Sequence, residues 1–264
     1  MPNSASEYSF LRQKENNGKV FSTGIWKVSC RKAKRTVIRL LAGNDLEHIR
    51  ARLAEMGVKE ALHALFSGIC RSEENIRWNA IVCMGTVVAR LAEQDMEEAR
   101  IVMRRLLWSL NDESGGIGWG APEAMAEIMA CHEGLAEEYI HMLISYMRED
   151  GEELFQDGNY LEHAGLQRGL MWGMARLAAT RPDMLVRRGA ISDLLPYLHS
   201  SDATVRGLAA RSLGLLGAEE ALPRLQLLGN DDELVRFFDA GSVRSAKVAE
   251  LASTAIDMIT SREI

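Results

Sequence analysis

The chain has 264 residues, of which 47% are hydrophobic and 26% charged, and its formal net charge is −6 at pH 7. This composition is typical of a soluble globular protein, and no apolar run approaches the ~20 residues that a membrane-spanning helix needs. The first residues carry no signal-peptide pattern, and the four cysteines (Cys30, Cys70, Cys83 and Cys131) form no Cys-x-x-Cys pair. We therefore expect no membrane segment, reduced thiols and a cytoplasmic location.

The charge is distributed unevenly along the chain. Residues 1–39 carry nine basic and two acidic side chains, a charge of +7, so the remaining residues carry −13. An acidic surface repels the phosphates of a nucleic acid, and nucleic-acid binding is therefore not expected for most of the chain. The basic residues 27–39 leave it open as a weaker alternative.

Residues 1–24 are rich in Ser, Asn, Gly, Lys and Glu without a stable period, which predicts a flexible arm. Residues 25–41 combine apolar and basic side chains at helical spacing, which predicts a helix that caps the domain. From residue 44 onward apolar residues recur at the helical period, and no segment alternates as a strand would. The predicted helices cover residues 45–56, 59–69, 73–92, 96–110, 123–129, 135–148, 160–179, 184–198, 204–216, 219–227 and 246–259.

A repeat is visible in these helices. Near the C-terminus, Asp202, Val205-Arg206, Ala209-Ala210 and Leu213-Gly214 occur in order, Asn75 to Gly85 form a looser copy, and Asp231 to Arg236 resemble the start of another. Aligning Gly85, Met129, Gly173 and Gly214 gives steps of 44, 44 and 41 residues. The pattern resembles HEAT-like repeats of the phycobilin-lyase type over about residues 40–260. That resemblance implies an all-α fold, a right-handed α-solenoid of about five helix pairs, with residues 25–264 as one domain.

The glycine-rich segment from Asn111 to Glu123 interrupts this regularity. It has four glycines, Trp119, and a Pro122 positioned to start a helix. Such a turn can hold an anion on its N–H groups, but it can equally be a tight connection that packs Trp119 between repeats. It matches neither of the common phosphate-binding glycine motifs.

Polar and aromatic residues fall at matching positions of the repeats around this segment. If the second helix of each pair forms the concave face, they would line a groove there; the tryptophans could also be ordinary core residues. The predicted binding residues are Trp78, Asn79, Asn111, Asp112, Glu113, Trp119, Glu123, Glu127, Glu162, His163, Arg168 and Trp172. No spacing of His, Cys or carboxylates identifies a metal site, a cofactor or a catalytic residue.

These patterns predict a non-enzymatic scaffold that binds a protein partner on its concave face, centred on residues 111–127. Two alternatives stay open. The same groove could serve a lyase-type enzyme or hold a cofactor, a tetrapyrrole or a metal, and residues 27–39 could bind nucleic acid. Neither enzymatic activity nor its absence follows from the sequence.

Overall fold

The computed structural model describes residues 33–111, 118–149 and 158–261. The predicted arm, residues 1–24, lies outside them. Residues 33–41 are helical and precede the other elements. The helices are α2 (Leu46–Ala54), α3 (Val58–Ile69), α4 (Glu74–Gln94), α5 (Met96–Leu110), α6 (Ala121–Cys131), α7 (Glu133–Ser145), α8 (Ala164–Thr180), α9 (Pro182–Arg187), α10 (Ala190–Leu194), η1 (Leu195–His199), α11 (Ala203–Leu216), η2 (Glu219–Ala221), α12 (Leu222–Leu227), η3 (Leu228–Asn230) and α13 (Val248–Thr260).

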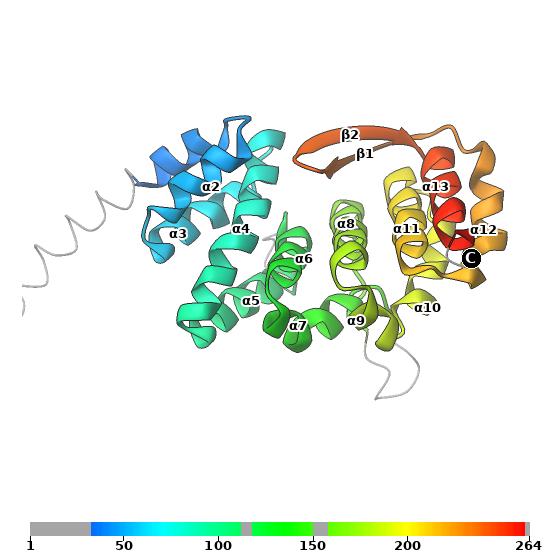
Figure 1. Ribbon diagram of the computed structural model, residues 1–264, viewed down its shortest axis with the longest axis horizontal. Coiled ribbons are helices and arrows are strands. Elements are labelled where there is room, and N and C mark those ends of the chain that lie inside the picture. Colours follow the sequence, from blue (N-terminus) through cyan, green and yellow to red (C-terminus); the bar gives the residue numbers. More distant parts are fainter. Residues whose placement is uncertain (1–32, 112–117, 150–157, 262–264) are drawn as a thin grey trace, which may run out of the picture.

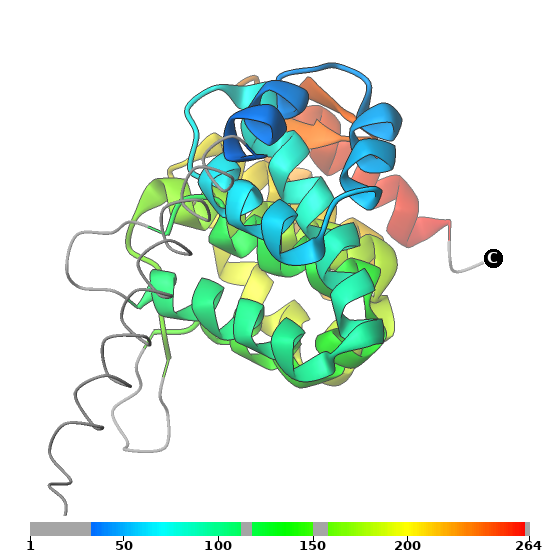
Figure 2. The same cartoon turned by 90° about the vertical axis from the view of Figure 1, so that its left-hand side faces the viewer.

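The helices form an α-solenoid, as predicted. Helices α4, α6, α8, α11 and α13 pack side by side in chain order and are called the main row below. Helices α5, α7, α9 and α10 lie along one side of this row (Figure 1). Figure 2 shows the same stacking viewed from the end that carries α2 and α3. Within the described ranges, no helix combines the length and apolarity needed to cross a bilayer.

Local sequence explains where several helices begin. Asp45, Asp95 and Asp202 each accept backbone N–H groups of the first turn that follows them, and His132 and His163 do the same through Nδ1. These acceptors satisfy donors that a helix start leaves without intrahelical partners. The predicted helix 184–198 is instead divided into α9, α10 and η1, with breaks near Gly189 and Pro196.

Small residues let the helices of the main row approach closely. A Cβ atom added to Gly214 of α11 would lie 2.5 Å from the Cα of Ala255 in α13, and one added to Gly173 of α8 would lie 2.9 Å from the Cβ of Ala126 in α6. Both distances are shorter than contacts between carbon atoms allow. The glycines that mark the repeat are therefore contact points between neighbouring helices.

The expectation that the chain lacks strands is wrong. Strands β1 (Leu234–Asp239) and β2 (Ser242–Lys247) form an antiparallel hairpin where the sequence predicted the start of a further repeat. Ala240 and Gly241 make its two-residue turn with φ angles of 47° and 84°, and a glycine adopts this conformation at little cost. The hairpin precedes α13 in the chain. From the start of α13 it extends past α11 and α8 towards α4 (Figure 1).

Gly214→Ala is expected to destabilise the protein. Replacing a helical glycine by alanine usually adds about 0.5–1 kcal/mol of stability, but here the new methyl group would meet the backbone of α13. We expect the free energy of unfolding, measured in urea, to fall by about 1–3 kcal/mol, as overpacked cores do. The control is Gly229→Ala, because no atom lies within 4 Å of the added Cβ there. Equal stability of the two variants would contradict this account.

Candidate functional site

Two cavities lie beside the hairpin and share Trp172, Leu208 and Phe237 in their walls. The first, called the arginine cleft, has a volume of about 480 Å³ and lies at the N-terminal ends of α4, α6, α8 and α11. Its polar and aromatic lining comprises Arg77, Trp78, Trp119, Glu123, His163, Arg168, Trp172, Arg236 and Phe237. The second, called the hairpin cavity, has a volume of about 440 Å³ and includes Glu47, Arg50, Glu127, Arg176, Arg211 and Asp239 in its lining.

Aromatic contacts hold the hairpin against the main row. The ring of Phe238 stacks on Trp78 with centroids 5.1 Å apart, and Trp78 lies 4.9 Å from Trp172. The indole Nε1 of Trp172 donates a 2.7 Å hydrogen bond to the carbonyl oxygen of Phe238. Because Trp78 and Trp172 belong to α4 and α8, this cluster ties β1 to two helices. The predicted tryptophan site is therefore occupied in part by the chain's own hairpin.

Glu123 is a buried acid in the arginine cleft. It is 6% exposed, and its carboxyl group lies so close to α8 that a Cβ on Gly169 would be 2.5 Å from its Oε2. Burial raises the pKa of Glu123, while its own backbone N–H and the charge of Arg77 oppose the shift. No hydrogen bond to it from another described residue accompanies that burial. The neutral form is favoured more than in an exposed glutamate.

The three arginines of the cleft differ in their partners. Arg168 contacts Asp202 at 2.7 Å, and Arg236 of the hairpin contacts Glu74 of α4 at 2.6 Å. The guanidinium of Arg77 lies 5.3 Å from the ring centroid of Trp78, and its buried Nε has no hydrogen-bond partner. Arg77 forms no ion pair at contact distance with a described residue, but its charge helps to lower the pKa of both Glu74 and Glu123.

Trp119 and His163 form the exposed edge of the cleft. The ring of His163 meets Trp119 edge-on at 4.8 Å, and its Nδ1 accepts the backbone N–H of Gly165. Trp119 stays 38% exposed. The next residue, Gly120, has a φ angle of 75°, and a Cβ there would lie 2.6 Å from the carbonyl oxygen of Ile69. A glycine at this position is therefore required by backbone conformation and by packing.

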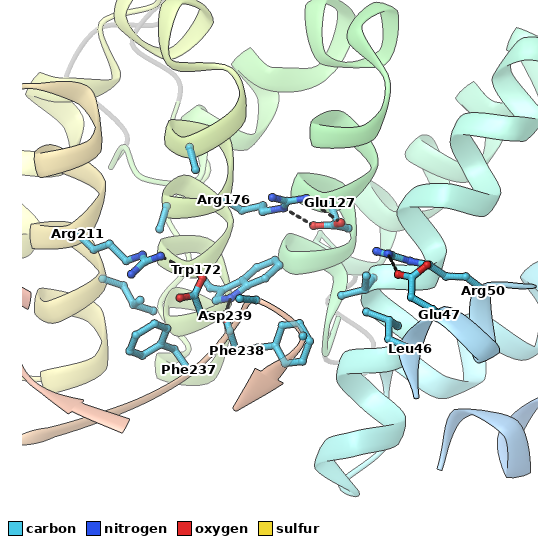
Figure 3. Close-up of a pocket in the computed structure, with 16 residues that line it drawn as sticks. Leu46, Glu47, Arg50, Glu127, Trp172, Arg176, Arg211, Phe237, Phe238 and Asp239 are labelled. Carbon is cyan, nitrogen blue, oxygen red and sulfur yellow. Dashed lines mark hydrogen bonds and ion pairs between the residues drawn. The ribbon is translucent and has the colours of Figure 1, made fainter. Parts of the chain in front are cut away.

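The hairpin cavity is crossed by ion pairs between different elements (Figure 3). Glu127, only 2% exposed, accepts from Nε of Arg176 at 2.6 Å, which joins α6 to α8. Asp239 of the hairpin contacts Arg211 of α11 at 3.1 Å. Because these charges neutralise one another locally, the cavity favours no single sign of ligand charge. Burial raises the pKa of nearby Cys131 to about 11, so its thiol stays protonated at neutral pH.

The structure brings six of the twelve predicted binding residues together in one cleft and places four others elsewhere. Asn79 donates to the carbonyl oxygens of Leu41 and Gly43, Asn111 accepts from the hydroxyl of Tyr146, and Glu162 is exposed outside both cavities. Asp112 and Glu113 lie outside the described residues. Glu127 lines the hairpin cavity. The residues that meet in the arginine cleft are Trp78, Trp119, Glu123, His163, Arg168 and Trp172.

Two parts of the site differ from the sequence-based expectation. The cavities are lined by the first helix of each predicted pair, together with the hairpin, and not by the second. Arg77 and Arg236 were also missed. Both have a sequence signal, since each occupies the arginine position of the repeat pattern, but the contact of Arg236 with Glu74, 162 positions away, does not follow from that pattern.

Part of the basic segment lies among the described residues. Of the basic segment 27–39, only residues 33–39 are described; Lys34, Arg35 and Arg39 line a pocket of about 360 Å³ with Ile38 and Arg71. Nucleic-acid binding there stays a prediction. In the described part of the chain, no three His, Cys, Asp or Glu side chains are grouped so that they could hold a metal ion.

Glu123→Gln is expected to raise stability at neutral pH. Because burial raises the pKa of Glu123, the unfolded chain loses this proton at a lower pH than the folded protein does, and the free energy of unfolding falls as the pH rises between the two values. The amide stays neutral, so the advantage should be present at pH 7 and vanish below about pH 4. Urea unfolding at both pH values measures it.

The matched control is Glu127→Gln, one turn further along α6. This change removes the charge that Arg176 binds and should lower stability at pH 7. A gain for Glu123→Gln that persisted at acid pH would contradict its origin in ionisation.

No family model matches the chain, and no curated protein matches it. Solved structures with similar folds include an engineered protein with 16% identity and a TM-score of 0.49, covering 87% of this chain and 97% of that one. Computationally designed armadillo repeat proteins for modular peptide recognition match with 19% identity and a TM-score of 0.48, over 86% and 92% of the chains. A designed armadillo repeat protein in complex with the peptide (KR)4 matches with 16% identity and a TM-score of 0.48, over 85% and 98%. At this level, none of them assigns a ligand or a partner to this chain.

Proposed function

We propose that this protein is a helical-repeat scaffold that binds a segment of a protein partner in the arginine cleft. One observation carries the proposal: the cleft places an exposed tryptophan, Trp119, in one lining with Arg77, Arg168 and the buried Glu123. Tryptophan and arginine are enriched among the residues that dominate protein interfaces.

The main row suits this role because its helices are closely packed. Four of its helices contribute first-turn residues to the cleft, and glycine contacts hold these helices in close register. Repeat proteins commonly bind their partners along such stacked helices. The hairpin covers part of the same face through Phe238, so a partner would enter at the side where Trp119 and His163 are exposed.

The hairpin cavity favours a second candidate function. Its volume of about 440 Å³ lies within the range of small-molecule sites, and it combines Trp172, Phe237 and Phe238 with paired charges. A cofactor-binding or lyase-type role, as the phycobilin-lyase-type repeat pattern suggests, would place its ligand there. Native mass spectrometry of the protein purified from its own source tests this role. A stoichiometric bound small molecule supports it, and a spectrum of the bare chain counts against it.

Trp119→Ala is expected to abolish partner binding while the fold is retained. Trp119 is 38% exposed, so its loss should lower stability without unfolding the helices, whereas a central interface tryptophan contributes about 2 kcal/mol or more to binding. Affinity capture with quantitative mass spectrometry, followed by binding measurements on the captured protein, checks this. Circular dichroism checks that the helices are intact.

The chain offers a matched control in Trp108. This tryptophan of α5 is 75% exposed and lies outside both cavities. Trp108→Ala should therefore leave partner binding unchanged. Loss of the partner with Trp108→Ala and its retention with Trp119→Ala would place the interface on α5 and refute the proposal.

A further inference from the structure

The hairpin is anchored at its base and held at its end by side chains. At the base, Val235 packs so closely on α11 that a Cβ added to Gly207 would lie 2.8 Å from its Cγ2. The backbone N–H of Val248 also donates to the carbonyl oxygen of Glu233 there. Residues 236–243, called the tip below, share no backbone–backbone hydrogen bond with α4 or α8 within the described ranges. The tip can therefore leave these two helices while the base stays in place.

The turn at the end of the tip is strained. Ala240 and Gly241 have φ angles of 47° and 84°, and a two-residue turn of this kind is most favourable with asparagine or glycine at its first position. An alanine there brings its Cβ too close to the following carbonyl oxygen. In the described part of the chain, Ala240 is the one residue other than glycine with a positive φ. The contacts of the tip with the helices offset this strain.

The tip covers three recognition groups on α4 and α8. The ring of Phe238 stacks on Trp78 at an interplanar angle of 14°, and its carbonyl oxygen accepts from the indole Nε1 of Trp172. Arg236 pairs with Glu74 at 2.6 Å. Removing the tip would uncover a face of Trp78, an indole N–H donor and a carboxylate, all directed at the same groove. Such a set suits an aromatic side chain, a backbone carbonyl and a cation.

The spacing of these groups fits an extended peptide. Glu74 and Trp78 are four residues apart on α4, so they share a face and lie about 6 Å apart along the helix axis. Arg236 and Phe238 are two residues apart on β1, so they share a face of the strand at about 6.7 Å. Because the two spacings agree, a basic residue and an aromatic residue at positions i and i+2 meet the carboxylate and the ring together.

The contacts of the tip differ in strength. The side chains of Arg236 and Glu74 are 67% and 34% exposed, and exposed ion pairs contribute little affinity. The ring of Phe238 is buried, and stacking adds to the effect of its buried area. The indole of Trp172 binds a backbone carbonyl, which every residue has. The aromatic side chain is therefore the main anchor, and the basic residue adds selectivity.

We infer that the tip occupies the partner's binding site in the free protein, and that the partner presents an extended segment with an aromatic residue two positions after a basic one. This segment displaces residues 236–243 and takes over their contacts with Trp78, Trp172 and Glu74. The inference rests on the proposed function and names the chemistry of the partner. A tethered competitor has a high local concentration, so the strained turn at Ala240 makes its displacement easier.

The probe is a fluorescein-labelled peptide with the sequence of residues 233–239, titrated with the full-length protein and followed by fluorescence anisotropy. Phe238→Ala in the protein removes the competing ring and should raise peptide affinity about tenfold or more. Ala240→Asn relieves the turn, favours the closed tip and should lower peptide affinity about two- to fivefold. The control is Leu234→Ala, which should bind like the wild type, because Leu234 is 70% exposed and outside both cavities.

Peptide variants test the recognition pattern on the Phe238→Ala protein. Alanine in place of the phenylalanine that corresponds to Phe238 should weaken binding about tenfold or more. Alanine in place of the arginine should weaken it about two- to fivefold, as loss of an exposed ion pair does. Exchanging that arginine with the preceding valine keeps the composition, changes the spacing and should weaken binding as much.

Hydrogen exchange of the wild type reports displacement directly. Saturating peptide should speed the exchange of the β1 and β2 amides, because a two-stranded hairpin without a supporting surface is only marginally stable. If Phe238→Ala does not fold, as judged by circular dichroism, this measurement and the Ala240→Asn comparison decide between the same two results.

Several outcomes would overturn the inference. Equal peptide affinity of the wild type, Phe238→Ala and Ala240→Asn would show that the tip does not compete. A peptide that tolerates alanine at the aromatic position would rule out the proposed pattern, and a peptide that binds no form of the protein would rule out a site in the groove. In each case, capture of a partner that depends on Trp119 would leave the proposed function standing.

Discussion

The close approach of the main-row helices is the constraint on which both cavities depend. Gly85 lies against Glu127, and Gly169 lies against the carboxyl group of Glu123, at distances that no side chain at either glycine would allow. The same positions that set the helix spacing therefore also make room for two buried acids, one turn apart on α6. One acid has a guanidinium partner in Arg176, and the other faces a cleft. Helix packing thus decides which carboxylate is satisfied within the fold.

The solenoid could be predicted from sequence because its determinants are local. Helical periodicity, capping residues such as Asp202 and the spacing of the aligned glycines each act within a few turns. The hairpin could not be predicted in this way. Asp231 binds Arg206, and that contact is compatible with either a helix or a strand after it. The strands depend on Phe238 packing against Trp78 and Trp172, far away in the sequence.

The candidate site was predictable in part for the same reason. Trp78, Trp119, Glu123, His163 and Arg168 meet in one cleft because they lie near the N-terminal ends of stacked helices, and Trp172 joins them from further along α8. Asn79, next to Trp78, and Asn111, at the end of α5, instead bind nearby backbone carbonyls and the hydroxyl of Tyr146, which residue type alone does not reveal. Arg236 reaches the cleft only through the hairpin, so a prediction without strands had no means of placing it.

The two departures from the repeat meet at the same place. The glycine-rich connection before α6 includes Trp119 and Gly120 at the cleft, and the hairpin stands where the sequence predicted a further repeat. Through the hairpin, Arg236 and Phe237 also line the cleft. A repeat protein gains stability from regular contacts, so irregularities that converge on one cavity are better explained by binding than by folding.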